Sequence, residues 1–141
     1  MAGGKVGTQW VGLDAPLKYG HHASLAYQAE VAVLSRSINV AGSQASNAFG
    51  GHMMVVGGGS GKFAGARANN MGQLNVLGRY PFHFHLMGNA KDRAYTSDCV
   101  VTNSNFRAFV VHGTHDSTFI GNTAYNVQGM YIYAVYIYAD P

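Results

Sequence analysis

Apolar and polar residues alternate in short runs along this chain, with the period of two that is typical of β-strands. In the segment Phe82–His85, an extended backbone would place the two phenylalanines on one face and the two histidines on the other. No stretch shows a convincing helical period. We therefore expect an all-β chain with strands at Val31–Val40, His52–Val56, Phe82–Leu86, Cys99–Thr102, Phe109–Val111, Thr118–Ile120 and Met130–Tyr138.

A weak internal repeat indicates how these strands are arranged. The segments Asp98–Phe106 and Asp116–Tyr125 resemble each other at an offset of roughly 18 to 20 residues, which is near one rung of a parallel β-helix. A rung cannot bury its own apolar face and needs neighbours, and Ser, Thr and Asn can stack at its turns. The pattern predicts a right-handed parallel β-helix, which we expect to be a fragment of a longer solenoid.

The solenoid is expected to occupy most of the chain. Residues 1–26 would lead into it or partly cap it, and residues 27–141 would form its rungs. Within the rungs, the Gly/Ala-rich segment Gly57–Asn70 and the more charged segment Gly88–Thr96 are predicted to be insertions.

Composition narrows the choice of partners. Charged residues make up only 11% of the chain, so part of its surface is expected to be covered by further polypeptide or by neighbouring subunits. The net charge is +3 and the basic residues are scattered, which argues against a nucleic-acid partner but is compatible with an acidic polysaccharide. Cys99 stands alone, so no disulfide framework is expected. No apolar run is long enough to span a bilayer, and membrane attachment would have to come from flanking regions.

Several segments carry a resemblance to a known family. They are Tyr27–Ile38, Gly50–Met54, Asn70–Gln73, Arg79–Leu86, Val111–His115 and Asn122–Asn126. In their order and spacing they resemble the β-helical part of G8-domain proteins, which include cell-surface and secreted hyaluronan-depolymerising proteins and the fibrocystin group. The resemblance implies a parallel β-helix and an extracellular or cell-surface location.

The chain departs from that pattern near its end. After Asn126–Gly129, the hyaluronidase-like members continue with a histidine and an acidic segment, whereas this chain continues with the tyrosine- and isoleucine-rich Met130–Tyr138. Whether the chain is an enzyme, which would then be a polysaccharide hydrolase or lyase, stays open at this point. The tyrosine-rich strand is expected to be the next rung or a contact with another subunit.

Histidines and an arginine are the candidate catalytic residues. They are Arg79, His83, His85 and His112. If successive rungs register, the histidines would form one patch that could act as an acid or base, or bind a divalent metal ion through His83 and His85. The alternative is that these histidines make structural hydrogen bonds.

A second set of residues is expected to contact the ligand. It comprises His52, Arg79, Tyr80, His115 and Asp116. A guanidinium can hold a sugar carboxylate with two hydrogen bonds, although Arg79 could instead pair with Glu30 or Asp98. Glycoside hydrolysis usually needs two nearby carboxylates, and no pair among the six acids of the chain can be assigned from spacing.

Two functions are therefore open. The first is an extracellular β-helix that binds or acts on a hyaluronan-like polysaccharide. The second is a non-catalytic structural subunit of a fibrocystin-like extracellular or surface-appendage assembly, which self-associates through its tyrosine-rich strand.

Overall fold

A computed structural model describes residues 12–24, 26–27, 29–43 and 48–135. The chain forms two units, Met1–Val31 and Ala32–Pro141. In the first unit, the described residues form no regular strand; a local turn is closed where the Ser24 amide and hydroxyl donate to the Tyr27 carbonyl oxygen. The expectation that residues 1–26 lead into or cap the solenoid stays a prediction.

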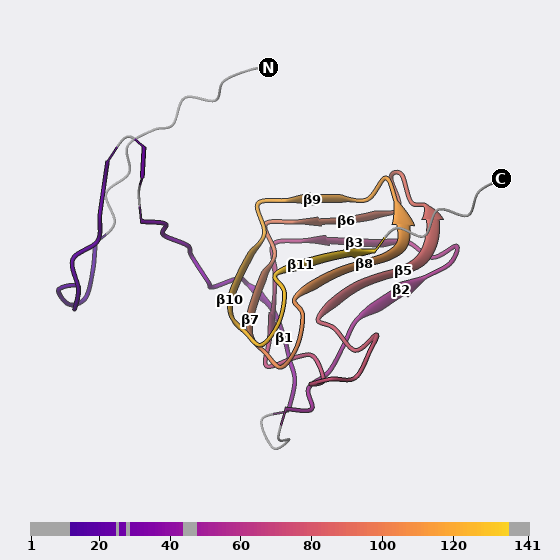
Figure 1. The fold of residues 1–141 in the computed structure, drawn as a ribbon, viewed down its shortest axis with the longest axis horizontal. Coiled ribbons are helices and arrows are strands. Elements are labelled where there is room, and N and C mark those ends of the chain that lie inside the picture. The colour runs from indigo at the N-terminus through magenta and orange to yellow at the C-terminus, as the bar shows by residue number, and fades with distance from the viewer. Residues whose placement is uncertain (1–11, 25, 28, 44–47, 136–141) are drawn as a thin grey trace. The chain divides into compact units, whose positions relative to one another are not determined.

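The second unit is a parallel β-solenoid of about three turns, built from three sheets (Figure 1). One sheet contains β1 (Ile38–Ala41), β4 (Ala66–Asn69), β7 (Val100–Ser104) and β10 (Thr123–Val127). The second contains β2 (Met54–Val56), β5 (Phe82–Asn89), β8 (Phe109–His115) and β11 (Ile132–Val135). The third contains β3 (Gly61–Ala64), β6 (Ala94–Ser97) and β9 (Thr118–Ile120). The strands pair in parallel within each sheet, which confirms the predicted β-helix.

The rungs are longer and less uniform than the internal repeat indicates. His85 lies opposite His112, which is 27 residues away, and Asn69 lies opposite Thr102, which is 33 residues away. Val100 pairs with Thr123, and the side chains of Asn103 and Asn126 contact across the same two rungs at a separation of 23 residues. The predicted offset of roughly 18 to 20 residues is therefore wrong, because turns of different length separate the strands.

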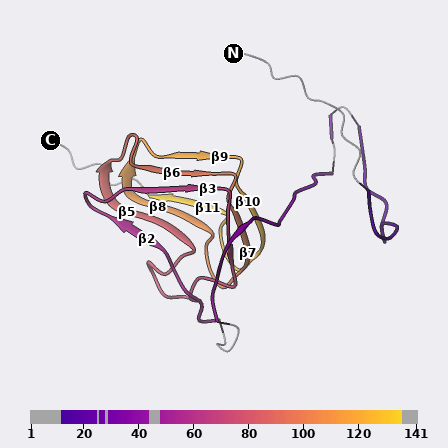
Figure 2. The ribbon, with the colours of Figure 1, turned by 180° about the vertical axis from the view of Figure 1, so that it is seen from behind.

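The segment Gly57–Asn70, predicted to be an insertion, contains two rung strands, β3 and β4. Figure 2 shows β3 beside β6, its neighbour on the next rung. Its small residues face the crowded interior: Ala66 and Ala68 are buried in one cluster with large aromatic side chains. A Cβ atom on Gly61 would lie 2.5 Å from Val55 Cγ2. Small residues indicate a narrow interior here rather than a loop.

Other predicted strand boundaries also change. The segment Gly88–Thr96, predicted to be an insertion, consists of the end of β5 at Asn89, a short turn at residues 90–93 and the start of β6 at Ala94. Of Val31–Val40 only the end is a strand, and Val31 is 83% exposed. Of Met130–Tyr138, β11 covers Ile132–Val135, and Tyr136–Tyr138 lie outside the described residues.

Stacked aromatic rings fill the interior. Phe82 and Phe109 are partners on adjacent rungs, and their rings stack with centroids 5.2 Å apart and planes 4° from parallel. Phe63 and Phe119 approach this pair edge-on from the sheet that contains β3, β6 and β9. Each rung thus buries the apolar face of its neighbour, as a solenoid requires.

Asparagines stack at one corner of successive rungs. Asn126 Nδ2 donates to Asn103 Oδ1, and Asn103 Nδ2 donates to Asn69 Oδ1, at 2.8 and 3.2 Å. Asn103 and Asn126 have positive φ angles of 51° and 54°, a conformation that asparagine tolerates better than most residues. Among the described residues, no helix is long and apolar enough to cross a membrane.

Candidate functional site

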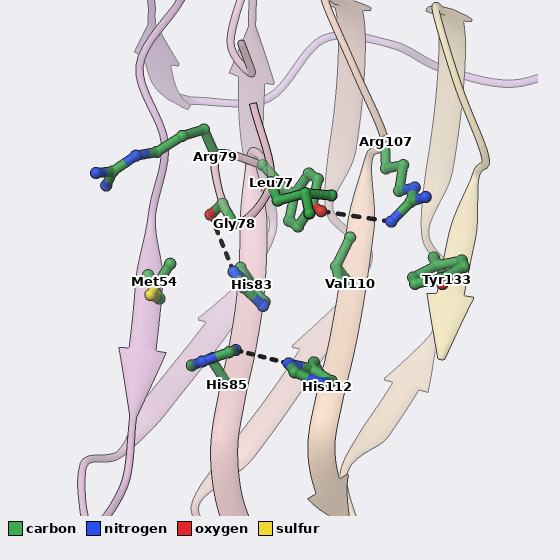
Figure 3. A pocket seen from close by; sticks show the side chains of 11 residues that line it. Met54, Leu77, Gly78, Arg79, His83, His85, Arg107, Val110, His112 and Tyr133 are labelled. Carbon is green, nitrogen blue, oxygen red and sulfur yellow. Dashed lines mark hydrogen bonds between the residues drawn. The ribbon is translucent and has the colours of Figure 1, made fainter. Parts of the chain in front are cut away.

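A pocket of about 580 Å³ lies on the outer side of the sheet that contains β2, β5, β8 and β11 (Figure 3). Strand alternation places it there, because Phe82 and Phe84 turn into the core while His83 and His85 face outward. The pocket is lined by Met54, Leu77, Gly78, Arg79, Tyr80, His83, His85, Arg107, Val110, His112 and Tyr133.

The turn that precedes β5 forms one wall of the pocket. Gly78 has a φ of 84°, which favours glycine, and its carbonyl oxygen lies 3.0 Å from His83 Nδ1. A carbonyl can only accept, so His83 Nδ1 carries the hydrogen. The edge of the His83 ring also contacts Tyr80, at a centroid distance of 5.0 Å. His83 is consequently only 3% exposed, although it lies on the outer face of its sheet.

Three histidines from two adjacent strands come together in this pocket. His83 and His85 lie two residues apart on β5, and His112 on β8 is the register partner of His85. One ring nitrogen from each of the three can be chosen so that all lie within 4.8 Å of one another. His85 Nδ1 and His112 Nδ1 are 3.0 Å apart, so one ring donates a hydrogen that the other accepts. The three-histidine cluster is defined as His83, His85 and His112.

A backbone irregularity follows this pair of histidines. Leu86 and Gly113, the residues after His85 and His112, both have positive φ angles, of 50° and 54°. The register between β5 and β8 shifts immediately after His85. Such bulges redirect neighbouring side chains and are frequent beside functional sites.

Burial favours the neutral form of two of these imidazoles, His83 and His85. Loss of solvent lowers the pKa of His83 to about 4, against a smaller opposite effect of its bond to Gly78. Burial also lowers the pKa of His85, with a further contribution from the charge of His112. Neutral imidazoles offer lone pairs to a proton or to a metal ion.

Two arginines lie at the rim of the pocket and differ in their contacts. The Arg107 guanidinium lies over the Tyr133 ring, 3.7 Å from its centre, and donates to the Tyr80 hydroxyl at 3.4 Å. Arg79 donates from Nη1 to His52 Nε2 at 2.6 Å, and in Figure 3 its side chain extends away from His85 and His112. This contact, after burial, lowers the pKa of His52. Arg79 thus pairs with His52, and among the described residues of this unit it forms no ion pair with Asp98, one of its two predicted carboxylate partners. The alternative pairing with Glu30, which belongs to the other unit, stays a prediction.

The structure brings together most of the residues expected at the site. Arg79, Tyr80, His83, His85 and His112 all line the pocket. His52 is adjacent through Arg79 but does not line it.

Two of the predicted ligand contacts lie elsewhere. His115 is the last residue of β8 and Asp116 follows it; there Asp116 Oδ2 accepts from Asn89 Nδ2 at 2.6 Å. Neither residue lines the pocket. The catalytic and binding roles of all these residues stay predictions.

Sequence reasoning missed Arg107 and Tyr133. A signal for Arg107 exists: it lies two residues before Phe109, Arg79 lies three residues before Phe82, and the two phenylalanines are register partners. Arg107 is therefore the arginine of the next rung. Tyr133 could not be found in this way, because its role depends on how β11 pairs with β8.

Comparison with known proteins shows which family this β-helix belongs to. Residues 48–134, which include every residue that lines the pocket, match the family model described as the CEMIP β-helix. The chain belongs to the CEMIP β-helix family. This confirms the resemblance to G8-domain proteins that the sequence motifs indicate.

Curated relatives of this family member come from Dictyostelium discoideum and mouse. Protein rliB of D. discoideum is 47% identical over 116 residues, which cover 81% of this chain and 10% of that protein. A G8 domain-containing protein from the same organism is 46% identical over 116 residues, with the same coverage of each chain. Mouse fibrocystin-L is 38% identical over 58 residues, or 41% of this chain and 1% of that protein. The chain thus spans about a tenth of the length of the first two relatives, and no solved structure matches it.

Proposed function

We propose that this CEMIP-family β-helix binds an acidic polysaccharide of the hyaluronan type in the pocket over β5 and β8, as part of an extracellular or cell-surface protein. The observation that carries the proposal is the charge of the pocket lining. Two guanidinium groups and three imidazoles line it, and no carboxylate is among the lining residues. The two guanidinium charges, with no acid in the lining to offset them, favour an anionic polysaccharide over a neutral one.

Arg107 is the residue best placed to hold a sugar carboxylate. Its guanidinium is held over the Tyr133 ring, which leaves a pre-organised set of N–H donors in the pocket lining. A guanidinium held in this way can bind a carboxylate with two parallel hydrogen bonds. Tyr80 supports Arg107 rather than the sugar, because its side chain is buried and its hydroxyl accepts from Arg107.

The residues that line the pocket support binding of the polysaccharide more directly than its cleavage. Glycoside hydrolysis with two carboxylates has no such pair among the lining residues. A lyase would need a base, which the His85 imidazole could supply, and a group that neutralises the uronate carboxylate. Analysis of the products would distinguish hydrolysis from elimination, because elimination leaves an unsaturated sugar and hydrolysis does not.

The test is binding of hyaluronan oligosaccharides to the 141-residue chain by calorimetry, with a neutral dextran as the reference ligand. Arg107→Met is compared with Lys62→Met, which removes the same charge from an exposed position on β3 in another sheet. We expect Arg107→Met to weaken hyaluronan binding by about tenfold or more, as for loss of a charge-assisted hydrogen bond, and Lys62→Met to leave it nearly unchanged. Equal affinity of the native chain and Arg107→Met would overturn the proposal.

The second candidate function is a structural subunit of a fibrocystin-like assembly. It is favoured by apolar side chains exposed on the last rung: Ile120 and Tyr125 are each 61% exposed and Ile132 is 43% exposed. Sedimentation of the chain at increasing concentration tests this role. Assemblies that dissociate on Ile132→Lys would favour it, whereas a monomer at all concentrations would count against it.

A further inference from the structure

One nitrogen in the pocket is left without a partner. His83 Nε2 is fully enclosed, and it forms no hydrogen bond with any described residue. A buried polar atom of this kind destabilises the folded chain if nothing binds it. Because Nδ1 of the same ring donates to the Gly78 carbonyl, Nε2 presents a lone pair. Figure 3 shows this free nitrogen on the side of the ring that faces His85 and His112.

The surroundings of His83 match those of a metal ligand. A metal-binding histidine almost always donates its second ring N–H to a carbonyl or carboxylate, which fixes the tautomer and the ring orientation. The 3.0 Å contact between His83 Nδ1 and Gly78 does this here. Gly78 is held in a left-handed conformation that directs its carbonyl to the ring, so the turn before β5 positions the ligand.

We propose that His83, His85 and His112 bind one divalent transition-metal ion in this pocket. The ligand atoms already lie within 4.8 Å of one another. Ligand nitrogens around a tetrahedral zinc ion lie about 3.3 Å apart, which follows from Zn–N bonds of about 2.0 to 2.1 Å. The His85 and His112 Nδ1 atoms, 3.0 Å apart, are close to that spacing. Both residues are only partly buried, so rotation of their side chains can bring them towards the fixed His83.

The tautomers permit this arrangement without a change in net protonation. In the metal-free pair, one Nδ1 carries the hydrogen that the other accepts. If the donating ring moves its hydrogen to Nε2, both Nδ1 lone pairs face the cation. The metal then replaces a hydrogen bond with two coordinate bonds and also satisfies His83 Nε2.

The chemistry of the ligand set selects the class of ion. Three neutral imidazoles suit Zn²⁺, Co²⁺ and similar ions, whereas Ca²⁺ and Mg²⁺ require oxygen ligands that the pocket lining does not supply as carboxylates. Three protein ligands leave a fourth position open towards the pocket. That position would accept water or a carboxylate oxygen.

Metal binding is measured on the full chain without a polyhistidine tag, after treatment with a chelator. Co²⁺ is titrated by visible absorption and Zn²⁺ by calorimetry. His83→Asn is the key variant, because an asparagine amide can keep the hydrogen bond to Gly78 while removing the proposed ligand atom. His112→Ala removes a second ligand, and His115→Ala, at an exposed position on the same strand, is the matched control.

We expect one ion per chain with the absorption of tetrahedral Co²⁺. Loss of a second-sphere partner typically costs 10- to 100-fold in affinity, so His83→Asn and His112→Ala should each cost at least about 100-fold. His115→Ala should bind as the native chain does, and circular dichroism checks that each variant is folded. Failure of the native chain to bind one ion, or unchanged affinity in His83→Asn, would overturn the proposal.

The metal site and the glycan proposal are tested separately. The titrations contain no polysaccharide, and hyaluronan binding can be repeated on the chelator-treated chain. Absence of a metal signal, together with hyaluronan binding that depends on Arg107, would overturn the metal site alone. A metal signal without hyaluronan binding would overturn the glycan proposal alone.

Discussion

Replacing Asn122 with alanine tests how side-chain hydrogen bonds hold one rung to the next. Asn122 lies in the turn between β9 and β10, where its Oδ1 accepts from the Cys99 amide at 3.0 Å. Its Nδ2 donates to the Thr96 carbonyl oxygen at 3.1 Å and to Thr96 Oγ1 at 2.9 Å. One asparagine thus connects its own rung to both ends of the turn between β6 and β7.

The expected loss of stability follows from what the alanine would leave behind. Cys99 and Thr96 are both 0% exposed, so the Cys99 N–H and the Thr96 hydroxyl would lose this partner in a buried setting. An unsatisfied buried donor costs about 1 to 3 kcal/mol, and the other two bonds add to it. We expect Asn122→Ala to lower the free energy of unfolding by about 2 to 4 kcal/mol.

Urea unfolding followed by circular dichroism measures this change, with linear extrapolation to water. Asn89→Ala is the control: Asn89 also makes side-chain hydrogen bonds, to Asp116 and the Lys91 amide, but it is exposed, and water can replace them. It should cost less than about 1 kcal/mol. If the two alanine variants lose the same stability, burial of the asparagine bonds is not what makes them important.

Three further outcomes are expected. Burial lowers the pKa of His83 to about 4 in the folded chain, against 6.5 for an unperturbed histidine, so the unfolded chain binds more protons between these two pH values. In chelator-treated protein, the resulting contribution of about 3 kcal/mol to the free energy of unfolding should be present in full above pH 6.5 and lost as the pH falls towards 4. Urea titrations at several pH values measure this dependence, and His83→Asn should flatten it. Burial raises the pKa of the Cys99 thiol, and a thiol-specific reagent at about pH 8 should therefore react with the native chain far more slowly than with the unfolded chain; equal rates would contradict the buried position. Phe109→Ala should cost about 3 to 5 kcal/mol, because its ring is 0% exposed and stacks on Phe82, whereas Tyr125→Ala, at a position 61% exposed, should cost less than about 1 kcal/mol in the same unfolding assay.

The sequence by itself was sufficient for the family and the type of fold. Alternation in Phe82–His85 indicates which side chains enter the core. This alternation depends on neighbours a few residues apart, so it can be read along the chain. The same holds for the pairing of His83 and His85 on one face of a strand.

Rung length and the completion of the site were decided only by the tertiary structure. Gly61, Ala66 and Ala68 resemble a loop in sequence, but they lie in strands. Ala66 and Ala68 are buried, and the side chains around Gly61 leave no room for a Cβ atom. His112 joins His85 because rungs 27 residues long register there, and the irregular turn lengths hide that distance in the sequence. Arg107 and Tyr133 meet for the same reason. Strand alternation is set by local backbone geometry, whereas contacts between rungs depend on the length of every turn that separates them.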